Sequence, residues 1–123
     1  MLNRIVMIGR LTKDPELKYT QSGTVVCTFS IAVGRTFQTD VTDYFDVVVW
    51  RKMGENCANY LSKGKLVAID GSLQTRSYET KDGSKRKVYE IVAETVKFLS
   101  PKDEQAAPAE AQIEPVADDD LPF

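Results

Sequence analysis

One stretch of strict alternation constrains the fold of this chain more than any other feature. Between Thr24 and Val33, one phase of the sequence is apolar: Val25, Cys27, Phe29, Ile31 and Val33. The other phase is smaller and more polar. Because successive side chains of a strand point to opposite faces, this period of two predicts a long strand with one buried face. Similar patterns at residues 4–11, 44–51, 65–78 and 87–99 bring the expected number of strands to five.

Only one segment has the spacing of a helix. Met53, Cys57, Tyr60 and Leu61 fall on one helical face, and the Ser-Lys-Gly sequence at 62–64 ends it. Asp82 and Gly83 provide a tight turn between the last two strands. A helix between the third and fourth of five strands is the order of the OB-fold, a Greek-key barrel that binds ligands on strands 2 and 3. We therefore predict an all-β barrel with one short helix.

The acidic and basic residues are segregated along the chain. Residues 1–103 hold all 16 Lys and Arg and 12 of the 18 Asp and Glu, a net charge of +4, whereas residues 104–123 carry six acids and no base. The second segment also lacks the apolar content needed to offset the entropy of ordering. We predict a domain at 1–103, a short disordered linker at 104–117 and an acidic tip at 118–123.

Several function classes are excluded or weakened by composition. The chain has no histidine, the commonest general base and zinc ligand, and no phosphate-binding or CxxC motif. Its two cysteines, Cys27 and Cys57, occupy apolar contexts that indicate buried reduced thiols. No run approaches the roughly 20 apolar residues that span a bilayer, and no secretory signal is visible. We expect a cytoplasmic binding protein with no enzymatic activity, cofactor, metal or membrane partner.

The third predicted strand provides the candidate binding face. Phe45, Val47 and Val49 share its buried phase, which leaves two aromatic rings, Tyr44 and Trp50, on the other. Six residues separate these rings by roughly 20 Å, a span that suits several nucleotides laid along a strand. Further candidates are the rings of Phe37, at the end of the second strand, and Tyr78, in the last hairpin, and the bases Arg35, Arg51, Lys52, Arg76, Lys85, Arg86 and Lys87.

This mixture of rings and bases is what a sequence-tolerant groove for single-stranded DNA needs, because aromatic faces stack on bases and cations bind phosphates. Two other interpretations remain open: aromatic residues on a barrel strand are often core or interface residues, and the triplet at 85–87 fits a solvated hairpin tip equally well.

The last six residues form a separate candidate site for a protein partner. They combine three acids with an apolar end: Asp118, Asp119, Asp120, Leu121, Pro122 and Phe123. The terminal ring would enter an apolar pocket while its carboxylate binds a basic or backbone-amide nest. A solubilising tail would explain the aspartates but not an exposed terminal phenylalanine.

Segments along the whole barrel are similar to one known family. They are residues 1–4 (MLNR), 9–17 (GRLTKDPEL), 48–52 (VVWRK), 60–64 (YLSKG), 73–78 (LQTRSY) and the tip at 118–123. Through them the chain resembles the bacterial single-stranded DNA-binding proteins. The resemblance implies a nucleoid-associated OB-fold homotetramer that wraps single-stranded DNA and recruits replication, recombination and repair proteins through its tip.

The same resemblance assigns base stacking to the four rings already nominated: Phe37, Tyr44, Trp50 and Tyr78. The loop at 38–42 is shorter than usual for the family, and the linker at 104–117 is brief. These departures suit a phage-encoded or secondary paralogue.

Two alternatives from other classes remain open at this stage. The rings at 44 and 50 would be an interface in an OB-fold module that binds protein, such as a primosome accessory. Carboxylates at Asp14, Glu16 or Asp46 would serve a metal-dependent nuclease, for which the sequence offers little support.

Overall fold

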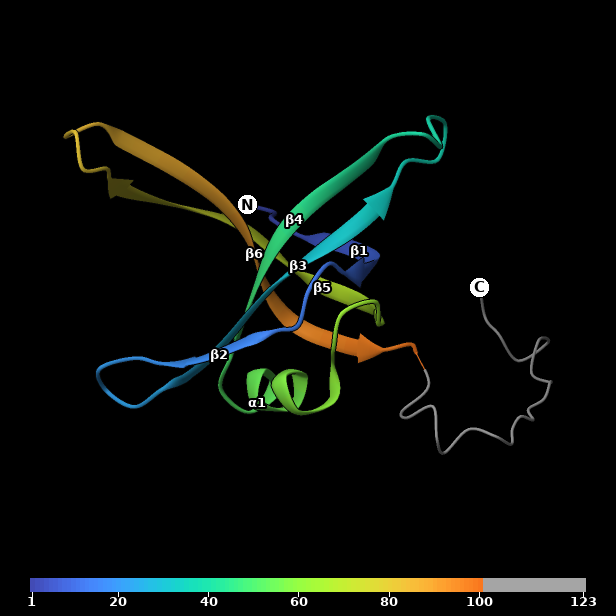
Figure 1. Ribbon diagram of the computed structural model, residues 1–123, viewed down its shortest axis with the longest axis horizontal. Helices are drawn as coiled ribbons and strands as arrows, with labels where there is room; N and C mark the ends of the chain where they lie inside the picture. The colour runs from blue at the N-terminus through green and yellow to red at the C-terminus, as the bar shows by residue number, and fades with distance from the viewer. Residues whose placement is uncertain (101–123) are drawn as a thin grey trace.

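A computed structural model describes residues 1–100 of the chain, which form six strands and one helix (Figure 1). The elements are β1 (Ile5–Leu11), β2 (Glu16–Tyr19), β3 (Val25–Gly34), β4 (Thr42–Trp50), α1 (Arg51–Tyr60), β5 (Leu66–Glu79) and β6 (Lys85–Phe98). The predicted linker at 104–117 and tip at 118–123 lie outside the described residues. Within residues 1–100, no helix is both long and apolar enough to cross a membrane.

The sheet closes on itself into a barrel. Its strand order is β1-β5-β6-β4-β3-β2, and an additional pairing of β1 with β3 at Arg10–Ala32 and Leu11–Ile31 completes the ring. The neighbours pair antiparallel except β4 and β6, which run parallel at Val47–Ile91 and Val48–Val92. The helix lies between β4 and β5 in the chain, so the predicted all-β barrel with one helix and OB-fold order is confirmed.

The five strands that close the ring, β1, β3, β4, β5 and β6, are the five that the sequence predicts, and the structure adds a sixth, β2, outside the ring. All four residues of β2 are exposed, so this strand has no buried face, and an alternation of only four residues is too short to predict a strand by itself. It pairs with β3 from Glu16–Thr28 to Tyr19–Val25. The third predicted strand also ends one residue early, because Arg51 begins the helix rather than ending the strand.

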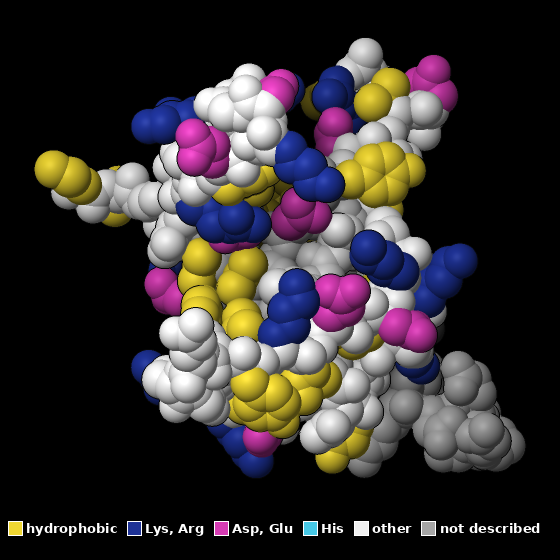
Figure 2. All heavy atoms as spheres, turned by 60° about the vertical axis from the view of Figure 1, so that its left-hand side comes forward, with side chains coloured by type: hydrophobic (Ala, Val, Ile, Leu, Met, Phe, Trp, Pro, Cys, Tyr) yellow, Lys and Arg dark blue, Asp and Glu magenta, His cyan; other side chains and the backbone are white. Residues whose placement is uncertain are grey.

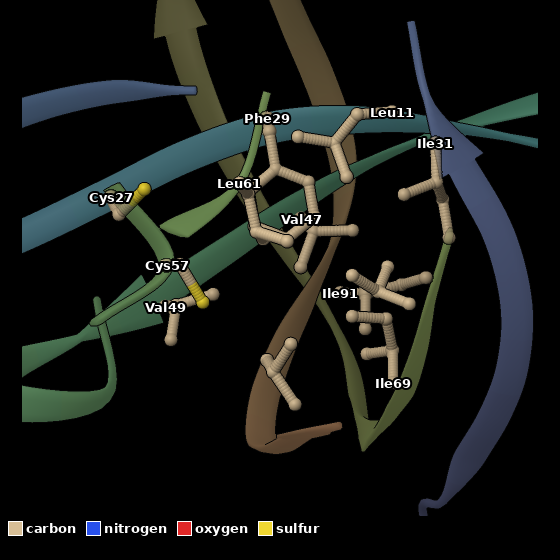
Figure 3. Packing of buried hydrophobic residues seen from close by; sticks show 12 residues of the cluster. Leu11, Cys27, Phe29, Ile31, Val47, Val49, Cys57, Leu61, Ile69 and Ile91 are labelled. Carbon is tan, nitrogen blue, oxygen red and sulfur yellow. The ribbon is translucent and has the colours of Figure 1, made fainter. Parts of the chain in front are cut away.

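The core is built from the predicted inward phases. Side chains from every strand except β2 converge with α1, as Figure 3 shows for Leu11, Ile31, Val47, Ile69 and Ile91. All of these are buried, and the apolar phase of β3 contributes Phe29 to the same cluster.

Both cysteines belong to this core and carry free thiols, as predicted. Removal from water raises the pKa of Cys27 to about 11 and that of Cys57 to about 12, because the interior disfavours the charged thiolate. The proximity of Cys27 raises the pKa of Cys57 further.

Two hairpins extend beyond the barrel and diverge from each other (Figure 1). The arm formed by β3 and β4 carries the turn at 35–41, and the arm formed by β5 and β6 carries the turn at 80–84. The helix covers the opposite end of the barrel. The molecule therefore presents one central face and two projecting arms to a ligand.

Candidate nucleic-acid interface

The outward face of β3 and β4 holds the central pair of rings. Tyr44 is 67% exposed and Trp50 41%, whereas Val47 and Val49 in the other phase are completely buried. The predicted phases of this strand are thus confirmed for these side chains. Across the ladder, Tyr44 stands beside Ala32 and Trp50 beside Val26, small or apolar neighbours that leave the ring faces open.

The other two predicted rings lie away from this pair. Phe37 was expected at the end of a strand, but β3 ends at Gly34 and Phe37 belongs to the turn of its arm, where it is 96% exposed. Tyr78 lies near the end of β5 on the other arm and is 47% exposed. The four rings therefore form a central pair with one outlying ring on each arm, not a single patch.

Several of the predicted cations are engaged by carboxylates. Arg35 donates from Nε to Asp43 at 2.8 Å, from a second nitrogen at 3.0 Å, and to Gln38 at 2.8 Å. The hydrogen bond with Asp43 raises the pKa of Arg35, and the same hydrogen bond lowers the pKa of the Asp43 carboxyl. Arg35 thus joins the two strands of its arm where the turn begins.

Arg76 and Lys52 are also paired. The Arg76 Nε lies 3.1 Å from a Glu90 oxygen, and the Lys52 ammonium lies 3.6 Å from Glu55 on α1. The Lys52 pair is solvent-exposed and weak, so Lys52 remains able to turn to a phosphate. In the other pair Arg76 is exposed, but the Glu90 side chain is only 16% exposed.

The basic triplet at the end of the second arm is divided between two faces. In the antiparallel register Arg86 stands opposite Tyr78, whereas Lys85 stands opposite Glu79 and Lys87 opposite Ser77. Since neighbouring positions alternate in direction, Arg86 shares a face with Tyr78 and Arg76, and the two lysines share the other. The structure therefore associates one member of the triplet, not all three, with a predicted stacking ring.

A cavity of about 210 Å³ opens on the outward surface between the central face and the β5–β6 arm. Its polar lining contains three bases, Lys13, Lys18 and Arg76, and three acids, Glu16, Asp46 and Glu90. Lys13 and Lys18 had not been expected here. Lys13 lies just before β2 and Lys18 lies in it, and β2 is the strand that the sequence did not predict.

The Asp46 carboxylate faces this cavity from between the two central rings, closer along the strand to Tyr44 than to Trp50. The Ser30 hydroxyl donates to one of its oxygens at 2.7 Å. Ion pairs are recorded for Glu16 with Lys18 and for Glu90 with Arg76, but Asp46 has a hydroxyl partner instead.

Of the three carboxylates considered for a nuclease, Glu16 and Asp46 line the same cavity and Asp14 does not. Asp14 accepts a hydrogen bond from the backbone N–H of Lys63 at 2.9 Å, away from the cavity that Glu16 and Asp46 line. Among residues 1–100, no group of three or more His, Cys, Asp or Glu side chains is placed to hold a metal ion.

Charge is mixed across the side of the molecule that carries the β5–β6 arm. In Figure 2 blue Lys and Arg side chains alternate with magenta Asp and Glu and with separate yellow hydrophobic patches. This side of the molecule therefore has separate positive, negative and apolar areas and no continuous basic stripe.

Comparisons with known proteins agree with this geometry. The model of the single-strand binding protein family matches residues 2–99. Single-stranded DNA-binding protein 2 of Clostridium acetobutylicum is 47% identical over 133 residues, covering 99% of this chain and 100% of the relative. Single-stranded DNA-binding protein A of Bacillus subtilis is 52% identical over 106 residues, covering 83% of this chain and 62% of that protein.

One solved structure extends the comparison to three dimensions. The structure described as the Plasmodium falciparum SSB complex with ssDNA superimposes with a TM-score of 0.74 at 30% sequence identity. The match covers 81% of this chain and 96% of the other.

Proposed function

Because the chain belongs to the single-strand binding protein family, we propose that it binds single-stranded DNA along the outward face of β3 and β4, without strong sequence preference. The observation that carries the proposal is that Tyr44 and Trp50 are exposed on one face of β4, whereas Val47 and Val49 on the other face are buried. Every base has a π-face, so stacking on these rings is tolerant of sequence. Phe37 and Tyr78 extend the path onto the two arms.

Phosphates along this path bind cations beside the rings. Arg51 and Lys52 follow Trp50 directly, and Arg76 and Arg86 share the Tyr78 face of the second arm. Arg35 binds a phosphate near Phe37 when it leaves Asp43. Lys85 and Lys87 lie on the other face of the β5–β6 hairpin and add positive potential there. The protein acts as a binding protein and not as an enzyme.

A fluorescence titration tests the proposal. Trp50 is the only tryptophan in the chain, so its quenching by an unstructured oligonucleotide reports stacking directly. Trp50→Ala should weaken binding of a labelled oligonucleotide by about 1–3 kcal/mol while folding is retained. Tyr60→Ala is the matched control, because Tyr60 is an exposed ring on α1 that lies beside Phe98 and not on the β3–β4 face. No quenching in the unaltered protein would contradict the proposal.

In the cytoplasm, binding of this kind would protect the single strands exposed in replication, recombination and repair. The tip, Asp118 to Phe123, would recruit proteins of those processes by placing the Phe123 ring in an apolar pocket and its carboxylate in a basic nest. Deletion of Phe123 alone should abolish this capture and leave the DNA titration unchanged.

We also propose a homotetramer, supported by the exposed surface of β1. This strand pairs with β5 from Ile5 to Arg10 but with β3 only at its last two residues, so among residues 1–100 the part of its other edge before Arg10 has no strand partner. Val6 and Ile8 are exposed beside that edge. An open edge with apolar side chains suits pairing with another copy. Light scattering should give four times the mass of one chain.

A further inference from the structure

We infer that Asp46 makes the central face selective for bases that carry an amino group, so that cytosine is favoured over thymine at one position of the bound strand. This inference rests on the proposed binding of single-stranded DNA. It adds a specificity-determining residue to a surface that otherwise binds by stacking and charge.

The position of Asp46 on β4 puts it under the path of the DNA. Its outward phase is shared with Tyr44, two residues before, and Trp50, four residues after. At about 3.3 Å per residue these steps are roughly 7 Å and 13 Å. A strand that stacks on both rings therefore has to cross Asp46 and the cavity beside it.

The Asp46 carboxylate is oriented by a hydrogen bond and can still accept another. Ser30, directly opposite on β3, donates its hydroxyl to one carboxylate oxygen at 2.7 Å. The side chain is thereby fixed at the cavity, and its second oxygen is left to accept from a ligand. At about 210 Å³ the cavity is smaller than the roughly 300–1,000 Å³ of pockets that enclose drug-sized ligands, so it suits one base edge.

A fixed carboxylate distinguishes bases by their donors. Cytosine presents an N4 amino group that donates to a carboxylate, whereas thymine has the O4 carbonyl at the same position. The ring donor of thymine, N3–H, lies between its O2 and O4 carbonyls, so a carboxylate that approaches it also meets two acceptors and binds thymine less favourably than cytosine. An acid also repels phosphates, so the nearby cations Lys13, Lys18 and Arg76 are better placed to hold the backbone while the base points to Asp46.

The experiment compares oligo-dC and oligo-dT of equal length in Trp50 quenching titrations of the full chain at one salt concentration. The readout is the ratio of the affinities for oligo-dC and oligo-dT. Removal of a negative charge or a change in stacking affects the binding of both oligonucleotides and therefore cancels in this ratio. Asp46→Ala should shift this ratio toward oligo-dT by about three- to tenfold. Asp46→Asn should shift it in the same direction, because an amide also offers a donor to thymine O4.

Glu55→Ala is the charge-matched control. Glu55 lies on α1 and does not line the cavity, so its removal should leave the ratio unchanged. An unchanged ratio in both Asp46 variants, or an equal shift in the Glu55 variant, would overturn the inference while the proposed function stands. Absence of quenching by either oligonucleotide in the unaltered protein would remove the proposed function and this inference with it.

Discussion

At the scale of single residues, Arg51 has an unusual backbone at a functionally placed position. Trp50 is extended, with φ −98° and ψ 153°, whereas Arg51 has φ 62°, a left-handed conformation that costs most L-residues about 1–2 kcal/mol. This residue turns the chain from β4 into α1 directly after the exposed ring. Its side chain is proposed to bind phosphate, a role that would explain an arginine where glycine would fit the backbone better.

Arg51→Gly and Arg51→Ala separate the two properties of this residue. Both remove the guanidinium, and both should weaken binding to single-stranded DNA and reduce its salt dependence by a similar amount. Only glycine relieves the left-handed backbone, so Arg51→Gly should exceed Arg51→Ala in free energy of unfolding by about 1 kcal/mol. Denaturant unfolding measures the difference. Equal stability of the two variants would show that the backbone at Arg51 is unstrained.

At the scale of elements, α1 depends on a close approach to the barrel. A Cβ at Gly54 would lie 2.4 Å from the carbonyl oxygen of Val49 and 3.3 Å from the backbone nitrogen of Cys27. Because Gly54 has no side chain, the helix packs directly against the backbone of β3 and β4. The second of these strands carries both central rings. The packing of α1 therefore affects the position of the proposed binding face.

Gly54→Ala should destabilise the fold by about 2 kcal/mol, because a backbone clash outweighs the gain in helix propensity. Gly34→Ala is the control: its Cβ would meet nothing within 4 Å, and its stability should change by less than about 0.5 kcal/mol. Thermal and denaturant unfolding of both variants provide the comparison. A Gly54→Ala protein as stable as the Gly34→Ala protein would contradict the packing described for α1.

The register of the β5–β6 arm leads to a second prediction at this scale. Arg86 shares a face with Tyr78 and Arg76, and Lys87 shares the other with Ser77. Arg86→Ala should therefore reduce the slope of log affinity against log salt by about 0.7, the value for one phosphate contact on a single strand. Lys87→Ala removes the same charge and should change the slope much less. Equal changes would mean that both faces of the arm contact DNA.

The elements differ in how far their sequence predicts them. The alternation of apolar and polar residues predicted β1, β3 and the outward rings of β4, because a half-buried strand has apolar residues on one face and polar residues on the other. The strand β2 is only four residues long and has no buried face, so the sequence alone does not place Lys18 beside the central face. Pairs such as Arg35 with Asp43 depend on the hairpin that joins β3 to β4, and the sequence alone does not specify which carboxylate will meet which cation.

At the scale of the whole molecule, charge separates the barrel from the segment that follows it. Residues 101–123 contain seven acids and one base, and the remainder of the chain has a net charge of +4. A chain ending at Ser100 should therefore bind single-stranded DNA at least as tightly as the full chain, with the largest gain at low salt, where repulsion between acids and phosphates is least screened. It should capture no partner proteins.

Titrations of both chains at several salt concentrations test this prediction. Weaker binding by the shorter chain at low salt would show that the segment supports DNA binding instead of opposing it. Unaltered partner capture would assign recruitment to the barrel.

The two buried thiols also determine how the protein can be labelled. The thiolate is the form that reacts with maleimides, and the pKa values of about 11 and 12 for Cys27 and Cys57 keep both sulfurs protonated and enclosed at neutral pH. One cysteine introduced at the tip of an arm, for example in place of the exposed Thr39, would be the fast-reacting thiol of the folded chain. A dye attached there would report the approach of a DNA strand to the arm, with the native cysteines left in place.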